Sequence, residues 1–271
     1  MSGQASDPME MVKSYKEFCA LRDVAKKTNV MDLSKHSWFY PSLLLPISSF
    51  IQNTPNVQVV KPNDQTVASY VDTVTKKSVD LSLPSSYLPV IAIPSNSKQL
   101  EEVLLKLYKI HNNGESYGGP NAFKLIFDEL IANMYDHAQF TTAFAMAQNY
   151  SKKRFLELCF FDNGISIPGS FTKHGIQFKD DYDAIAKAIN GVSTKDNSQR
   201  ERGYGLGDSL ALLSKALGGS AIIVSGAGAV LVKGDGFEPF ILSSDQVLHG
   251  TLIAARIPSE AKEVNIYDFI G

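Results

Sequence analysis

The sequence contains few cysteines, no long apolar run and almost no net charge. Of its 271 residues only Cys19 and Cys159 are cysteines, so neither a disulfide framework nor a cysteine-based metal site is expected. The most apolar stretch, residues 40–51, is interrupted by Pro41 and Pro46 and is too short for a membrane helix. These absences predict a protein without a membrane partner.

The charge and the first residues narrow the class further. Lys and Arg number 26 and Asp and Glu 28, a formal charge of -2, whereas nucleic-acid-binding proteins usually carry a basic patch. The opening segment, MSGQASDPMEM, has neither the basic nor the apolar region of a signal peptide. Because 44% of the residues are hydrophobic, the chain can form a core. We therefore expect a cytoplasmic globular protein with no nucleic-acid partner.

The segment NNGESYGGP, residues 112–120, divides the chain into two predicted domains, 1–115 and 116–271. This segment is rich in Gly, Asn and Ser and has no apolar periodicity, which is typical of a loop. Before it, strand-like and helix-like stretches alternate, a pattern that favours a small parallel α/β domain. The predicted helices cover 9–27, 41–52, 66–75 and 98–111, and the predicted strands 30–33, 57–60 and 88–93.

The second part of the chain has a different order of elements. Helices are predicted over 121–137, 183–190 and 204–217, and strands over 142–150, 154–161, 221–225, 230–233, 240–243 and 250–257. Runs of strands joined as hairpins, with helices between them, favour an α+β two-layer sandwich over a doubly wound sheet.

The predicted helix over 121–137 carries polar residues at helical spacing. Glu129 and Asn133 are four residues apart, and Asp136 and His137 follow one turn later, so these groups project along one side. One interpretation is an amphipathic helix whose polar face is solvated. The alternative is a functional face, because simple amphipathicity does not require an Asn flanked by acids one turn before and one turn after.

Two further motifs join this helix. Asp162 ends a strand-like run and precedes the turn at Gly164. Its carboxylate could lie at the edge of a pocket and accept a hydrogen bond from the amine of a base. The alternative is an ordinary turn that ends a strand. Gly203, Gly205 and Gly207 precede a predicted helix, so backbone N–H groups there could approach an anion, although a flexible hinge would show the same spacing.

The polar segment before the glycines carries Lys195, Arg200 and Arg202. Its cations could meet phosphates, or the segment could be a solvated loop. A P-loop of the GxxxxGK[ST] type is absent from the sequence. Alone, each of these motifs is a weak signal.

In this order, and with Gly250-Thr251 at the start of the last strand, the motifs resemble the boxes of the GHKL ATPases, the family of gyrase, heat-shock chaperones, histidine kinases and mismatch-repair ATPases. The resemblance covers residues 116 to 258 and implies a Bergerat-type ATP-binding fold. It implies that Asn133 holds Mg²⁺ on the phosphates, that Glu129 is the general base, and that Asp162 and Thr251 contact adenine. The remaining ATP-contacting residues that it implies are Asp136, His137, Gly164, Lys195, Gly203, Tyr204, Gly205, Leu206 and Gly207.

One position departs from the family pattern. The first glycine box often has a second glycine two residues after Gly164, and Ser166 stands there in this sequence. A fainter resemblance, over residues 30 to 52, links the first part to STAS domains, which partner ATP-binding anti-sigma kinases. The first part would then be a regulatory or partner-binding domain.

Two classes of function follow. The first is an enzyme that hydrolyses ATP with Mg²⁺ or transfers its phosphoryl group to a protein partner in signalling. None of the five histidines lies in the phosphoacceptor motif of a self-phosphorylating histidine kinase, so the acceptor would be a partner protein or water. The second is a non-hydrolysing module in which ATP controls partner binding. The helix over 9–27 suits either pairing of two subunits in a homodimer or packing within one.

Overall fold

The computed structural model describes residues 7–75, 87–94, 100–101, 104–105, 108–109, 111–194 and 205–269. Its main element is a seven-stranded sheet in which all neighbouring strands are antiparallel. In spatial order the strands are β3 (Tyr87–Ala92), β4 (Ala143–Tyr150), β5 (Phe155–Asp162), β9 (Leu248–Pro258), β6 (Ser220–Gly226), β7 (Gly228–Lys233) and β8 (Gly236–Pro239).

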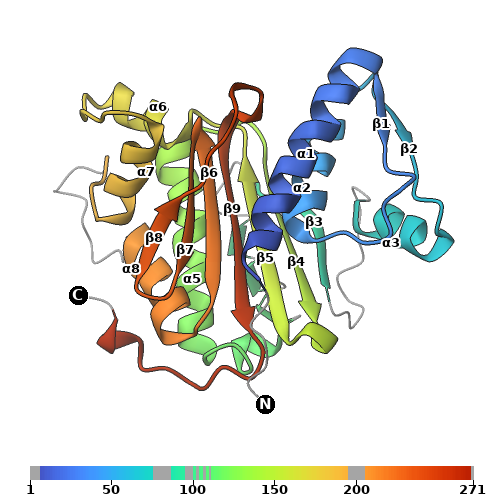
Figure 1. Cartoon of the computed structure of the whole chain (residues 1–271). Coiled ribbons are helices and arrows are strands. Elements are labelled where there is room, and N and C mark those ends of the chain that lie inside the picture. The colour runs from blue at the N-terminus through green and yellow to red at the C-terminus, as the bar shows by residue number, and fades with distance from the viewer. Residues whose placement is uncertain are drawn as a thin grey trace.

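Helices cover both faces of this sheet (Figure 1). One face is covered by α5 (Pro120–Asn133), α6 (Ser166–Lys173), α7 (Asp181–Ile189) and α8 (Leu206–Ala211). The other face is covered by α1 (Met9–Thr28), α2 (Pro41–Asn53) and α3 (Gln65–Thr75). The predicted two-layer sandwich therefore describes only one side of the sheet, and the first part of the chain supplies a third layer.

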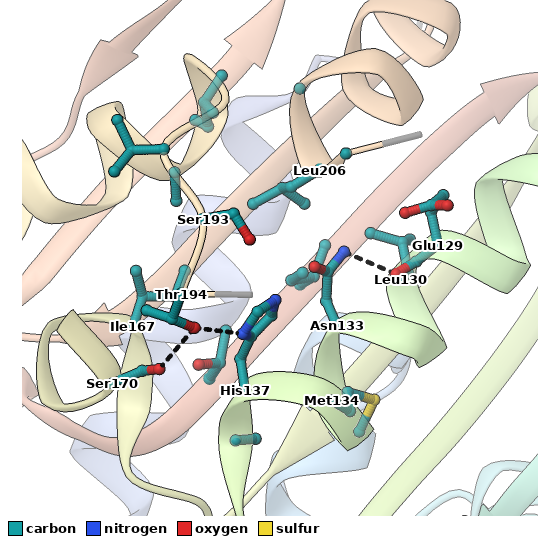
Figure 2. A pocket seen from close by; sticks show the side chains of 18 of the residues that line it. Glu129, Leu130, Asn133, Met134, His137, Ile167, Ser170, Ser193, Thr194 and Leu206 are labelled. Atoms are coloured by element: carbon teal, nitrogen blue, oxygen red, sulfur yellow. Dashed lines mark hydrogen bonds between the residues drawn. The ribbon is translucent and has the colours of Figure 1, made fainter. Parts of the chain in front are cut away.

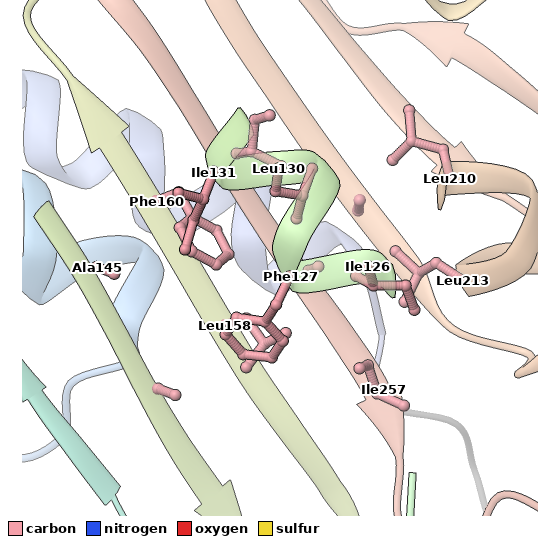
Figure 3. Close-up of a cluster of buried hydrophobic side chains, with 14 of the residues drawn as sticks. Ile126, Phe127, Leu130, Ile131, Ala145, Leu158, Phe160, Leu210, Leu213 and Ile257 are labelled. Atoms are coloured by element: carbon pink, nitrogen blue, oxygen red, sulfur yellow. The ribbon is translucent and has the colours of Figure 1, made fainter. Parts of the chain in front are cut away.

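The strands alternate between these two cores. Leu158 and Phe160 of β5 pack against α5, where Figure 3 shows them beside Phe127 and Ile131. Cys159, between them, faces the α1–α2 side and is fully buried, as expected for a core residue. Because both faces are buried, these strands appear in the sequence as continuous apolar runs rather than as alternating ones.

A small parallel sheet accompanies the third layer. It consists of β1 (Val30–Asp32) and β2 (Gln58–Val60), with α2 between them in the chain. This part of the parallel α/β prediction is confirmed. The prediction that the strand at 88–93 belongs to the same unit is wrong: β3 pairs antiparallel with β4 at the edge of the large sheet. Residues from both sides of the predicted boundary at 115 thus share one sheet.

Two other local predictions need correction. The strand predicted at 240–243 lies instead at 236–239, because a two-residue turn at Gly234-Asp235 returns the chain at once and pairs Lys233 with Gly236. Helix α6 was not predicted, since Pro168-Gly169 is typical of a turn; proline is tolerated here because it lies in the first turn of the helix. The predicted helix at 98–111 lies partly outside the described residues.

Helices α1 and α2 are joined to the sheet by a buried ion network. Glu157 of β5 and Arg256 of β9 are opposite each other in register, and their Oε2 and Nε atoms are 2.7 Å apart. The side chains are 0% and 1% exposed. Glu157 Oε1 also accepts a hydrogen bond of 2.8 Å from the backbone N–H of Ser42 at the start of α2, and Arg256 Nη1 lies 2.7 Å from Glu10 Oε2 on α1. One pair of strands therefore anchors both helices.

Helix α1 has buried side chains along its length, Met11 and Tyr15 among them, and these pack on the sheet of the same chain. The structure thus shows this helix packed within one chain. No helix within the described ranges is long and apolar enough to cross a membrane.

Candidate functional site

A cavity of about 680 Å³ lies between α5, the end of β5, α6, the start of α8 and residues 190–194. Its size is in the range of small-molecule and cofactor sites. Figure 2 shows Glu129, Asn133 and His137 along one wall, with Thr194 beside His137. The predicted site residues that line it are Glu129, Asn133, His137, Asp162, Gly205, Leu206, Gly207 and Thr251.

One wall is formed by α5 and the π-helical turn Met134–Ala138 that continues it, and its lining residues are four apart. Glu129, Asn133 and His137 line the cavity, whereas Asp136, three residues after Asn133, is exposed and does not. The amide of Asn133 is oriented within the helix, because its Nδ2 donates a hydrogen bond of 2.7 Å to the carbonyl oxygen of Glu129. Its Oδ1 is therefore the amide atom available to a cation.

At the opposite wall, Asp162 is a buried carboxylate at the end of β5. It is 2% exposed, and its Oδ1 accepts a hydrogen bond of 2.8 Å from the backbone N–H of Gly164. Burial raises the pKa of Asp162 to about 6, although the backbone hydrogen bonds from Gly164 and Thr251 act in the other direction. At neutral pH this side chain is thus mainly an anionic acceptor inside the cavity.

Ser225 was not predicted, yet it connects three elements around Asp162. Thr251 is opposite both Asp162 and Ser225 in the sheet, and its Oγ1 is 2.9 Å from Ser225 Oγ. Ser225 Oγ also accepts a hydrogen bond of 2.8 Å from the backbone N–H of Ile167 in α6. The available signal in the sequence is a serine inside the apolar run AIIVSG, since a fully buried hydroxyl needs partners.

Three glycines of the family motifs lie where two backbone segments around the cavity come into close contact. A Cβ at Gly164 would lie 2.0 Å from the Ala138 carbonyl oxygen, one at Gly207 2.1 Å from that of Ile189, and one at Gly250 1.9 Å from that of Asp162. Gly164 itself does not line the cavity. At Gly205, by contrast, a Cβ would meet nothing within 4 Å.

Replacement of Gly164 by alanine is expected to destabilise the protein by about 3 kcal/mol, a typical cost of overpacking a tight contact. The added methyl group would overlap the Ala138 carbonyl, which accepts a hydrogen bond of 2.7 Å from Ile165 N–H. Urea unfolding measures the change. Gly236→Ala is the control, because a Cβ there has open space; equal stability of the two variants would contradict the close contact.

Ser166, the departure from the family pattern, lines the cavity in a left-handed backbone conformation with φ of +66°. That region favours glycine, and a residue with a Cβ occupies it at a cost of about 1–2 kcal/mol. Its Oγ accepts a hydrogen bond of 3.2 Å from Gly169 N–H. The turn is therefore of the kind that a glycine would form.

The described residues that line the cavity include carboxylates but neither Lys nor Arg. Glu129, Asp162 and Asp208 line the cavity, and no Lys or Arg from the described ranges does so. Asp208 Oδ2 accepts a hydrogen bond of 3.2 Å from Gly205 N–H. Among the described residues, no group of three or more His, Cys, Asp or Glu side chains could hold a metal. The predicted site residues Lys195, Gly203 and Tyr204 lie outside the described residues.

Lining residues that the sequence did not reveal come mainly from α6 and the segment after α7. Thr194 Oγ1 lies 2.6 Å from His137 Nδ1 and 3.4 Å from Ser170 Oγ. Isolated hydroxyl residues of this kind give no signal in a sequence.

Comparisons of the chain with protein-family models, with curated proteins and with solved structures give no match.

Proposed function

We propose that this chain binds Mg²⁺-ATP in the cavity, in the manner of the GHKL ATPases that its motifs resemble, and that α5–α8 with the large sheet form a Bergerat-type fold. The supporting observation is that four separate motifs meet at one cavity. Glu129 and Asn133 come from α5, Asp162 from the end of β5, Gly205–Gly207 from the start of α8, and Thr251 from β9.

Adenine is the base that the Asp162 end suits. Its exocyclic amine is a donor, and an ionised carboxylate inside a cavity accepts from it a strong, charge-assisted hydrogen bond. The hydroxyl of Thr251, held by Ser225, lies next to Asp162 in the register of the sheet. Apolar neighbours such as Ile167 and Ile253 line the same cavity and suit the faces of a base.

The phosphates would then lie toward Glu129 and the start of α8. Gly205 has no side chain there and open space around it, so a phosphate could approach its backbone closely. Mg²⁺ is commonly held by few protein groups together with phosphate oxygens, which agrees with a lining that has Asn133 Oδ1 but no cluster of metal ligands among its described residues. When bound, the cation would neutralise phosphate charge.

The reaction that this arrangement suits is phosphoryl transfer from ATP to water or to a hydroxyl group of a protein partner. Such transfer depends mainly on positioning and on charge neutralisation. Glu129 lines the cavity one turn before Asn133, where its carboxylate would orient the acceptor and take its proton. A signalling role in which a partner protein is the acceptor is part of this proposal.

Glu129→Gln is expected to lower the rate of ATP turnover at least about 100-fold, the usual contribution of a positioned general base. ATP affinity should stay within about threefold of wild type, since the side chain keeps its size. Phosphate release measures the first quantity and isothermal titration calorimetry with Mg²⁺-ATP the second.

The two outcomes separate the two classes of function. If wild type binds ATP but releases no more phosphate than Glu129→Gln, and labels no protein in cell extract with γ-phosphate, the chain is a nucleotide-controlled binding module. If wild type binds no ATP, the proposed function fails as a whole.

A further inference from the structure

We propose that residues 190–194, here called the strap, are fastened across the cavity by a hydrogen bond between Thr194 and His137, and that this bond controls entry to the Asp162 end. The identity of the ligand rests on the function proposed above, but the fastening of the strap does not. Five residues, Asn190 to Thr194, form the strap, and all of them line the cavity.

The first end of the strap is fixed by the end of α7. Val192 N–H donates to the Lys187 carbonyl at 2.9 Å, and Gly191 N–H donates to the Ala188 carbonyl at 3.2 Å. This pair of bonds is a Schellman motif, which requires a left-handed residue between them. Gly191 supplies it with φ of +88°. The strap therefore leaves α7 in a defined direction.

Thr194, at the other end of the strap, is bonded to the π-helical turn Met134–Ala138 that continues α5. Thr194 Oγ1 and His137 Nδ1 are 2.6 Å apart, a short hydrogen bond between partly buried groups. Ser170 Oγ of α6 lies farther away, at 3.4 Å from the same hydroxyl. Figure 2 shows these three side chains meeting at the Thr194 end of the strap. We call the Thr194–His137 bond the latch.

The latch lies at the base end of the proposed site. Ala138, the residue after His137, accepts a hydrogen bond of 2.7 Å from Ile165 N–H in the turn that follows Asp162. Glu129 is eight residues earlier on the helix, about 12 Å away along its axis. Because Thr194 and Asp162 line the same cavity, opening of the latch would widen access to Asp162 past Thr194 and speed both entry and release of a ligand by that route.

The test is amide hydrogen exchange of residues 185–194 in wild type, Thr194→Val and Thr194→Ser. Valine matches threonine in shape but has no hydroxyl, whereas serine keeps it. We expect Thr194→Val to speed exchange at Gly191 and Val192 roughly 2- to 13-fold, the range for loss of one neutral hydrogen bond, and Thr194→Ser to resemble wild type. Unchanged exchange in Thr194→Val, or equally fast exchange in Thr194→Ser, would overturn the latch.

His137→Leu removes the other half of the latch. If the bond exists, the double variant His137→Leu/Thr194→Val should exchange no faster than the faster of the two single variants. Effects that multiply would mean two independent contacts and would also overturn the proposal. This comparison holds even if one variant shifts overall stability, which far-UV circular dichroism and thermal unfolding would report.

Release of a fluorescent ATP analogue tests the consequence for the cavity. With the analogue bound, Thr194→Val should release it faster by a factor similar to that seen in exchange, while Thr194→Ser releases it at the wild-type rate. If wild type does not bind the analogue but the exchange pattern holds, the latch stands and the proposed function fails. If exchange changes and release does not, the strap lies outside the ligand's route and control of entry is refuted.

Discussion

Asp162→Asn is expected to weaken ATP binding and, at the same time, to stabilise the protein at pH 7. A hydrogen bond to a charged group contributes about 1.5–3 kcal/mol, so affinity should fall roughly 10- to 150-fold. Asparagine can still accept from Gly164, but its NH₂ group would present a donor where the adenine amine is also a donor.

The gain in stability follows from the raised pKa of Asp162. Its pKa is about 6 in the folded protein against 3.8 as the ordinary value, so between these pH values the folded state binds more protons than the unfolded state. The contribution of Asp162 to stability is thus fully present below about pH 4 and is lost as pH rises through about 6, by about 3 kcal/mol in total. Asparagine removes this loss.

Urea unfolding from pH 3 to 8 and ATP titration measure the two effects. Asp136→Asn is the control for binding, because Asp136 is exposed and does not line the cavity. A variant Asp162→Asn that binds ATP as wild type does would refute the adenine assignment. If the stability of Asp162→Asn depends on pH as that of wild type does, the conclusion that burial raises the pKa of Asp162 is refuted.

Arg256→Met is expected to destabilise the protein by about 3–5 kcal/mol, the cost of removing one partner of a buried ion pair. Glu157, which has no exposed surface, would lose its guanidinium partner and retain the hydrogen bond from Ser42 N–H, and Glu10 on α1 would lose its contact with Arg256. Arg256 is also held over the rings of Tyr40 and Phe155, at 4.6 and 4.4 Å from their centres.

The matched control is Arg154→Met. Arg154 pairs with Glu260 at the surface, where both side chains are more than 60% exposed, and such pairs contribute about 0–1 kcal/mol. Urea unfolding of both variants measures the difference. If Arg256→Met costs no more than Arg154→Met, the network does not anchor the third layer as described.

The helices and strands that could be predicted are those with strong periodicity or long apolar runs. Helix α1 and strands β4, β5 and β9 follow directly from their residues. The place of β3 could not be predicted, because its apolar run suits either a small parallel unit or the edge of a larger sheet, and only its tertiary contacts with β4 and α3 decide between them.

The site was predicted where a motif occupies a helix or a strand end. Glu129, Asn133 and Asp162 reach the cavity because helical spacing and the end of a strand fix their direction. Ser170 and Thr194 could not be found, since a hydroxyl in a loop reaches a cavity only through tertiary contacts. Gly164 was expected to contact the nucleotide, whereas the structure gives it a contact with Ala138.

The close contacts at Gly164, Gly207 and Gly250 have a consequence for evolution. Each of these glycines is required by the approach of two backbone segments, whatever the cavity holds. If the chain binds ATP as proposed, a descendant that lost this binding would still be selected to keep them, because their replacement destabilises the fold. Asp162 is under the opposite pressure, since its burial costs stability and only a ligand would repay it. Among descendants of this chain, the acid rather than the glycines would therefore mark those that still bind the nucleotide.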